Sequence, residues 1–301
     1  MGLDSREESN AQKALNAAIK QAKSLNIPDL RYSLEKIFKA HASIIQSIYD
    51  YKPKLDVGEV YIESLSIKLL LASKSIVKLS FGDNLSGVHQ YKKIEIIDRS
   101  SIFILTRAIV ENFLTLEYLF YNDLCKEEQI FRYNLWRISG FKVRQSYGEN
   151  LRQQYLEKLE REKQEIEYLT DSIQKSKYYS NLNKNNIWKL NKYGFPRILS
   201  WDKLIDESQL NSSIVKKAYT LYSNYAHSEF ISAIQINENG NHKNSKFNQE
   251  TLTTSLSLIR MINCVSILQL INKFQFSKEV YNKMNKELKH EIEFWKNIIT
   301  L

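Results

Sequence analysis

Glycine and proline are scarce in this chain: its 301 residues include 8 glycines and 3 prolines. A sandwich or barrel of short strands needs a turn signal roughly every 8–12 residues. The chain has too few turn-forming residues for such a fold, and long stretches without helix breakers favour helices. We therefore expect an all-α protein arranged as a helical bundle.

Cysteine is scarcer still, with only Cys125 and Cys264, which lie far apart in the sequence. They do not make a disulfide framework, and no further Cys or His stands beside either at metal-ligand spacing. The chain also lacks a P-loop, a dinucleotide-binding glycine fingerprint, an H-E-x-x-H motif and paired E-x-x-H motifs. We expect no metal, no cofactor and a reducing, cytoplasmic location.

Long uncharged apolar runs are missing as well. The N-terminus, MGLDSREESN, has no hydrophobic core of the kind that a secretion signal needs. The two most apolar windows are Ser101–Phe120, which contains Arg107 and Glu111, and Leu256–Ile271, which contains Arg260. We therefore expect no membrane-spanning segment.

Positive charge is in excess, with a formal net charge of +9 and a pI near 9.2. Such a balance favours anionic partners, namely nucleic acid, nucleotides or a membrane surface. The abundance of Lys, Asn, Ile and Tyr has a second explanation, because AT-rich coding sequence produces this composition whatever the function. Charge alone leaves both readings open.

Apolar periodicity divides the chain into helices and suggests two parts. We expect an N-terminal helical extension over residues 1–60 and a bundle domain over residues 61–301, with an insertion at 148–200. The expected helices span residues 8–24, 28–50, 59–79, 98–121, 126–143, 148–176, 201–207, 212–236, 249–274 and 277–298. Segment 98–121 is apolar nearly all round, which predicts the central helix.

The insertion differs from the rest of the chain. Residues 148–176 have a sparse apolar stripe on a long, heavily charged helix, which is typical of a projecting helical arm that binds a protein partner or of a plain solvated helix. Residues 177–200 are rich in Asn and predict a long loop. The stretch 173–201 has no Asp or Glu and interleaves cations with aromatic residues, among them Lys184, Trp188, Lys189, Lys192, Tyr193 and Arg197. This pattern suits single-stranded nucleic acid, although the aromatic rings of a loop also serve to pin it to a core.

Two helical segments carry the strongest candidates for chemistry. Arg107 and Glu111 are four residues apart on one helix face, within apolar surroundings that predict a partly buried ion pair. Tyr219, Ser223 and His227 form a second stripe at i, i+4 and i+8. Histidine is the side chain most easily tuned for proton transfer near neutral pH. Each stripe has an alternative reading as a structural feature that fixes helix packing.

The segments RAIVENFLTLEYL and YTLYSNYAHSE together resemble a bacterial helical family, domain of unknown function 5677. The family pattern pairs an R-x-x-x-E helix with a helix that ends in a serine and then a histidine. The matching residues are Arg107, Glu111, Ser223 and His227, and the resemblance covers roughly residues 95–275, without the insertion at 148–200.

That family is similar in turn to the HEPN group of helical domains, many of which are metal-independent RNases of toxin–antitoxin and anti-phage systems. The resemblance implies an RNA or nucleotide ligand and a homodimer. HEPN enzymes carry R-x(4–6)-H on one helix, whereas positions 220–222 of this chain are Thr, Leu and Tyr. A comparable site would need its arginine from another helix, and Arg107 is the candidate.

Two functions follow from these observations. The first is a defence or toxin protein that acts as a nucleic-acid or nucleotide binding module without catalysis. The second is a metal-independent RNase in which His227 moves the proton, Arg107 stabilises the phosphate charge and Glu111 holds the arginine. In this second function either Tyr219 or Tyr222 orients the histidine. Burial discriminates between them, because a solvent-reachable contact between His227 and Arg107 favours the enzyme and a sealed one favours the module.

Overall fold

The computed structural model describes residues 26–85, 94–147, 153–210, 213–240 and 242–299. Within these ranges nearly all regular structure is helical, apart from a short antiparallel pair formed by β1 (Asp83–Leu85) and β2 (Ile94–Ile96). The predicted all-α class is therefore confirmed. The helix expected at residues 8–24 lies outside the described residues.

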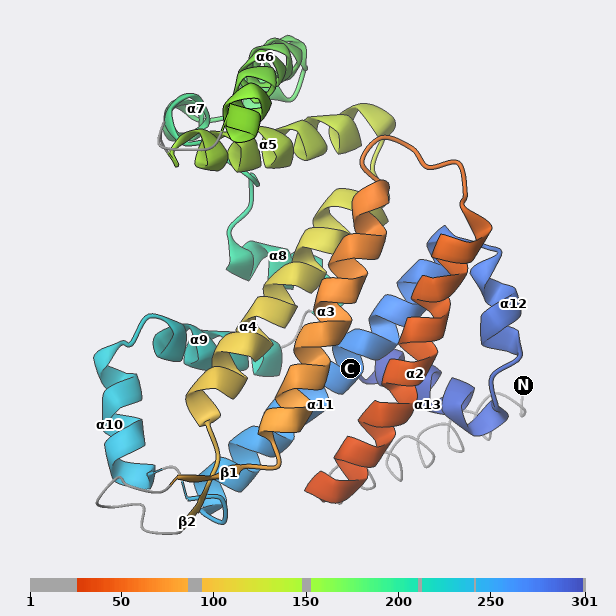
Figure 1. The fold of residues 1–301 in the computed structure, drawn as a ribbon, viewed down its shortest axis with the longest axis vertical. Helices are drawn as coiled ribbons and strands as arrows, with labels where there is room; N and C mark the ends of the chain where they lie inside the picture. Colours follow the sequence, from red (N-terminus) through yellow and green to blue (C-terminus); the bar gives the residue numbers. More distant parts are fainter. Residues whose placement is uncertain (1–25, 86–93, 148–152, 211–212, 241, 300–301) are drawn as a thin grey trace, which may run out of the picture.

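Most of the described helices form one bundle around α11 (Lys246–Lys273), which runs through the middle of the molecule (Figure 1). The helices that pack against it are α2 (Ile27–Tyr51), α3 (Val60–Leu79), α4 (Arg99–Leu116), α12 (Ser277–Asn282) and α13 (Lys286–Ile299). α11 buries every side chain from Leu258 to Ile267. It is thus the central helix, a place that the sequence analysis assigned to segment 98–121. α4 instead has an open side, where Ile104 is exposed.

α11 is also the one helix of the described ranges that is long and apolar enough to cross a membrane. Of its most apolar window, 78% is buried inside the protein. Such burial is typical of the core helix of a soluble protein, because a helix that is apolar all round needs apolar neighbours on every side.

The first described helix, α2, belongs to this bundle. The Asn26 side chain caps it by accepting a hydrogen bond from the backbone N–H of Asp29 at 3.0 Å. Its apolar stripe, which includes Leu30, Leu34 and Ile37, is buried in the same core cluster as α11. The described part of the expected N-terminal extension, residues 1–60, is therefore built into the bundle rather than set apart from it.

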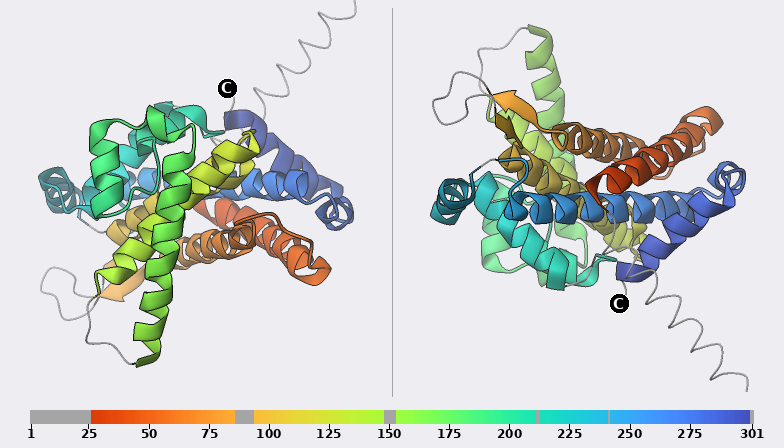
Figure 2. Two further views of the ribbon diagram at one scale, coloured as in Figure 1. Left: turned by 90° about the horizontal axis from the view of Figure 1, so that it is seen from above. Right: turned by 90° about the horizontal axis from the view of Figure 1, so that it is seen from below.

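A smaller helical lobe lies at one end of the bundle (Figures 1 and 2). It contains α5 (Lys126–Gln145), α6 (Gln153–Lys175), the short 3₁₀ helix η3 (Tyr179–Asn181) and α7 (Lys184–Lys192). The lobe has its own hydrophobic cluster, formed by Phe131, Leu135, Ile138, Leu169, Ile173, Leu182 and Leu190. The described part of the helix expected at 148–176 therefore packs along α5. Its sparse apolar stripe contributes Leu169 and Ile173 to this second cluster.

The loop expected at residues 177–200 is the clearest correction to the sequence analysis. Part of it is the helix α7, whose N-terminus is capped by the Asn183 side chain accepting from the N–H of Asn186 at 2.8 Å. Leu182 and Leu190 anchor the segment in the small cluster. Asparagine therefore acts here as a helix cap, although a run of asparagines favours a loop in the sequence alone.

The helix expected at 212–236 is broken into α9 (Ser213–Ala226) and α10 (Phe230–Asn239). Ser228 adopts the left-handed conformation with φ of 54°. The N–H of Glu229 donates to the carbonyl of Asn224 at 2.9 Å, and the N–H of Ser228 to that of Tyr225 at 3.3 Å. These bonds are those of a Schellman motif, and they make His227 the last residue of the turn that ends α9.

The remaining expectations differ less from the structure. The short helix at 201–207 is confirmed as α8 (Trp201–Glu207), which the Ser200 side chain caps. The helix expected at 277–298 is divided into α12 and α13. α4 continues directly into a π-helical turn, η2 (Glu117–Tyr121), which also packs against α5.

Candidate functional site

The side of α4 that faces α9 carries a charged pair. Arg107 and Glu111 are one helical turn apart, and the Arg107 Nε donates to Glu111 Oε1 at 2.9 Å. The two side chains are 17% and 26% exposed, so they are shielded from solvent but reachable. Burial opposes the charge of Arg107, yet its bond to Glu111 prevails and raises the pKa of the guanidinium above its ordinary value. The predicted partly buried pair is thus present.

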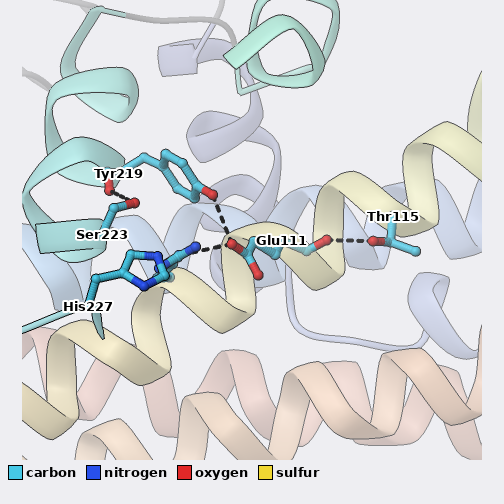
Figure 3. Close-up of polar contacts among 6 residues, drawn as sticks. Glu111, Thr115, Tyr219, Ser223 and His227 are labelled. Atoms are coloured by element: carbon cyan, nitrogen blue, oxygen red, sulfur yellow. Dashed lines mark hydrogen bonds and ion pairs between the residues drawn. The ribbon is translucent and has the colours of Figure 1, made fainter. Parts of the chain in front are cut away.

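Tyr219 of α9 completes the contact between the two helices. Its hydroxyl donates to the same Glu111 Oε1 at 2.8 Å (Figure 3), and its ring centroid lies 5.6 Å from the Arg107 Cζ. Burial and the neighbouring carboxylate raise the pKa of Tyr219 to about 12. The phenol therefore stays protonated at neutral pH and holds the Glu111 carboxylate in position.

His227 lies at the exposed end of this contact. Its Nε2 is 2.9 Å from the Arg107 Nη1, and its side chain is exposed at the C-terminal turn of α9 (Figure 3). A guanidinium only donates hydrogen bonds, so the His227 Nε2 acts as the acceptor in this contact. The contact expected between the two helices is thus made, and it is open to solvent.

The other tyrosines and serines of α9 do not join the contact. The Ser223 hydroxyl donates to the backbone carbonyl of Tyr219 at 2.8 Å and does not bond His227 (Figure 3). Tyr222, which the sequence offers as a second neighbour of the histidine, is buried and pairs with Ser255 at 3.0 Å. Ser223 was predicted as a site residue from its helical spacing and from the family resemblance, and its hydroxyl bonds the helix backbone instead.

Glu111 also lines a pocket of about 310 Å³ on its other side. Arg197 is part of this pocket, with its guanidinium stacked 3.7 Å above the ring centroid of Trp201. The backbone N–H of Ile198 donates to the Tyr118 hydroxyl at 3.2 Å and so fixes the segment against η2. Arg197 lies in the basic stretch 173–201, and no signal in the sequence links it to Glu111.

The other cations and rings of that basic stretch gather on α7 and just after it. Trp188 and Tyr193 are both exposed and meet edge to face, with centroids 5.6 Å apart. The Lys192 ammonium lies 5.1 Å from the first ring centroid and 4.9 Å from the second. Lys184 and Lys189 are exposed on the same helix. This α7 patch belongs to the small lobe, so the structure separates it from Arg197.

Metal ligands do not gather at either place. In the part of the chain that the structure describes, no group of three or more His, Cys, Asp or Glu side chains is arranged to hold a metal ion. Both cysteines are free, with Cys125 exposed and Cys264 buried.

Comparison with known proteins adds one finding. Residues 94–245, just over half of the chain, match the model of the Family of unknown function (DUF5677). The match contains Arg107, Glu111, Arg197, Tyr219 and His227, and it also includes the insertion, which the sequence resemblance left out. No curated protein and no solved structure matches the chain. The chain belongs to the Family of unknown function (DUF5677).

Proposed function

We propose that this protein cleaves RNA without a metal ion, by transesterification at the site formed by His227 and Arg107. One observation carries the proposal: the solvent-exposed His227 Nε2 lies 2.9 Å from the Arg107 guanidinium. A proton acceptor and a phosphate-binding cation are thereby adjacent and reachable, which is the arrangement that favours the enzyme over a sealed structural contact.

The contacts suggest how the residues act. A phosphate oxygen is a stronger acceptor for a guanidinium than a neutral imidazole is, because it is charged. A bound phosphodiester therefore takes over the Arg107 Nη1 and releases the His227 Nε2. That nitrogen accepts the proton of the ribose 2′-hydroxyl, whose oxygen attacks phosphorus and forms a cyclic phosphate. The bond to the 5′-oxygen breaks, and that oxygen takes a proton from water. The hydroxide that remains takes the proton from the His227 Nε2, which restores the histidine.

Glu111 and Tyr219 act as positioning residues in this proposal. Glu111 holds the Arg107 Nε at 2.9 Å, and the Tyr219 hydroxyl fixes the carboxylate from α9 at 2.8 Å. Arg107 therefore meets the phosphate with its orientation already set, which reduces the entropy that binding would otherwise cost.

The α7 patch favours a second candidate, a nucleic-acid binding module without catalysis. Exposed Trp188 and Tyr193 rings beside Lys192 match the combination of stacking surface and cation that single-stranded nucleic acid uses. Binding of this kind weakens steeply as salt is raised, since counterions are released from the phosphates. An affinity that does not change between low and moderate salt contradicts the role of the patch.

Purified wild type and His227→Ala protein distinguish the two candidates. Incubated with cellular RNA in EDTA, the wild type is expected to cleave and the variant to lose about 100-fold or more of the rate, the usual size of a general acid–base contribution. Lys192→Ala is the matched control, because it removes a cation of the α7 patch and leaves the His227 contact intact. Full cleavage by His227→Ala, together with undiminished toxicity in cells, contradicts the enzyme proposal.

We further propose the setting in which this activity operates. The chain would be a HEPN-like toxin of an anti-phage or toxin–antitoxin system, located in the cytoplasm, where its RNA substrate and free thiols belong. A homodimer and a protein partner on α6, which exposes Tyr155 and Tyr168, complete this proposal. Growth and RNA integrity on expression, and the molar mass in solution, test the toxin role and the dimer respectively.

A further inference from the structure

The pocket beyond Glu111 is bounded by α3, α4, η2, α5 and α8 and by the segment that joins the two lobes. Its volume is about 310 Å³, and its walls combine charged groups with flat rings. The side chains that matter are those of Lys68, Glu111, Trp136, Arg197 and Trp201. Ligand pockets span roughly 300–1,000 Å³, so this one accommodates a single small ligand.

Arg197 is a charged residue of this pocket that has no ion-pair partner among the described residues. Its Nε is buried and has no hydrogen-bond partner, and Arg197 takes part in none of the ion pairs found among the described residues. Burial lowers the pKa of its guanidinium, and Glu111 offsets only part of that effect. Glu111 Oε1 already accepts from Arg107 and Tyr219. Arg197 is partly buried and has no ion-pair partner among the described residues, so an anion at this place would be stabilised by its charge.

Two further features restrict the chemical class of the ligand that this pocket can bind. Lys68 of α3 stands at the rim, exposed and outside the ion pairs of the described ranges, so a second cation is available for the same anion. Trp136 and Trp201 line the pocket as half-buried rings, and Trp201 already stacks a flat cation. Two cations beside indole faces suit a ligand that has both an anionic group and a planar ring.

We propose that this pocket binds one nucleoside monophosphate unit. Arg197 and Lys68 bind the phosphate, the indoles of Trp136 and Trp201 pack against the base, and Glu111 accepts a hydrogen bond from a ribose hydroxyl. Such a ligand fits the volume of the pocket, and its phosphate would pair with the Arg197 guanidinium, whose Nε has no hydrogen-bond partner. The inference goes beyond the proposed cleavage, because this binding needs neither His227 nor a phosphodiester bond.

Isothermal titration of the full chain tests the proposal with adenosine 5′-monophosphate, adenosine and inorganic phosphate as probes. We expect the mononucleotide to bind, and both adenosine and phosphate to bind at least about tenfold more weakly. Arg197→Gln should weaken mononucleotide binding by about tenfold or more, as loss of a charged hydrogen bond does. Lys189→Gln is the matched control, since it removes an exposed cation of the α7 patch and should leave the affinity unchanged.

Lys68→Gln provides a second variant in case Arg197→Gln does not fold, because Lys68 is exposed; we expect a severalfold loss of affinity. His227→Ala should bind the mononucleotide with the affinity of the wild type. A failure of the cleavage proposal can therefore be told apart from a failure of this binding proposal. If single-stranded RNA displaces the mononucleotide, the natural ligand is a nucleotide within RNA. If the RNA does not displace it, the natural ligand is a free nucleotide. No mononucleotide binding at millimolar concentration, or equal binding by folded Arg197→Gln, overturns the proposal.

Discussion

At the residue scale, one carboxylate oxygen organises the candidate site. Glu111 Oε1 accepts from Arg107 and from Tyr219, at 2.9 and 2.8 Å, and so joins α4 to α9. Among the described residues, His227 is connected to this arrangement only through Arg107. The Tyr219 hydroxyl is therefore the group of α9 that contacts Glu111 directly.

Tyr219→Phe should lower the free energy of unfolding by about 1–2 kcal/mol, because it removes a half-buried hydrogen bond to a charged acceptor. Urea denaturation measures the change. Ser223→Ala, one turn along the same helix, removes a hydroxyl that bonds only its own backbone, so its effect should stay within about 0.5 kcal/mol. If the two variants lose the same free energy of unfolding, the hydrogen bond from Tyr219 to Glu111 does not stabilise the protein more than the local Ser223 bond does.

Glu117 is a second residue whose surroundings predict a measurable effect. It is buried, accepts from the backbone N–H of Gln209 and from Gln269 Nε2, and burial raises its pKa to about 7. Between about pH 4.5 and 7 the folded chain keeps this proton and the unfolded chain releases it. The free energy of unfolding therefore falls as pH rises through this window, by on the order of 3 kcal/mol, and levels off above it.

Glu117→Gln should abolish that part of the pH dependence, because the amide has no proton to release. Denaturation at a series of pH values, with exposed Glu207→Gln as the control, measures the difference between the slopes. An unchanged slope in Glu117→Gln would mean that the carboxyl titrates alike in both states.

At the scale of elements, the break between α9 and α10 places His227. The left-handed residue of the Schellman motif is Ser228, where glycine is the usual choice. The sequence offers no glycine or proline there, so a continuous helix to residue 236 was the natural prediction. The break follows directly after His227, which lies exposed beside Arg107.

Replacing Ser228 tests this reading of the turn. Ser228→Gly should raise the thermal midpoint slightly, since glycine adopts positive φ without steric strain. Ser228→Val should lower the free energy of unfolding by about 1–2 kcal/mol, because a β-branched residue is strained there. Thermal and urea denaturation of both variants provide the comparison, and a stabilising valine would be inconsistent with the left-handed turn.

At the scale of the whole molecule, two hydrophobic clusters divide the described chain between a large bundle and a small lobe. Leu190 of α7 is fully buried in the small cluster. Leu190→Ala should cost about 2–5 kcal/mol locally and accelerate amide hydrogen exchange in α5, α6 and α7. Ile262→Ala in α11 is the counterpart and should accelerate exchange in the bundle. Uniform acceleration across both lobes in the first variant would contradict two separate cores.

The sequence predicted the helical class and the Arg107–Glu111 pair because both depend on local spacing. It predicted the contact of Arg107 with His227 only by pairing two segments that are 120 residues apart. It could not place Arg197 beside Glu111 or assign α2 to the bundle, since both depend on how distant helices pack. The α7 helix was missed because a short helix buries few apolar residues and its Asn183 cap resembles a loop residue.

A DNA oligonucleotide that contains a single ribonucleotide, incubated in EDTA with wild type or His227→Ala protein, tests whether cleavage needs a 2′-hydroxyl and His227. The wild type should cut only on the 3′ side of the ribonucleotide and leave a 2′,3′-cyclic phosphate, and His227→Ala should be slower by about 100-fold or more. Cutting at deoxynucleotides, or equal rates for the two proteins, would contradict a transesterification that depends on His227.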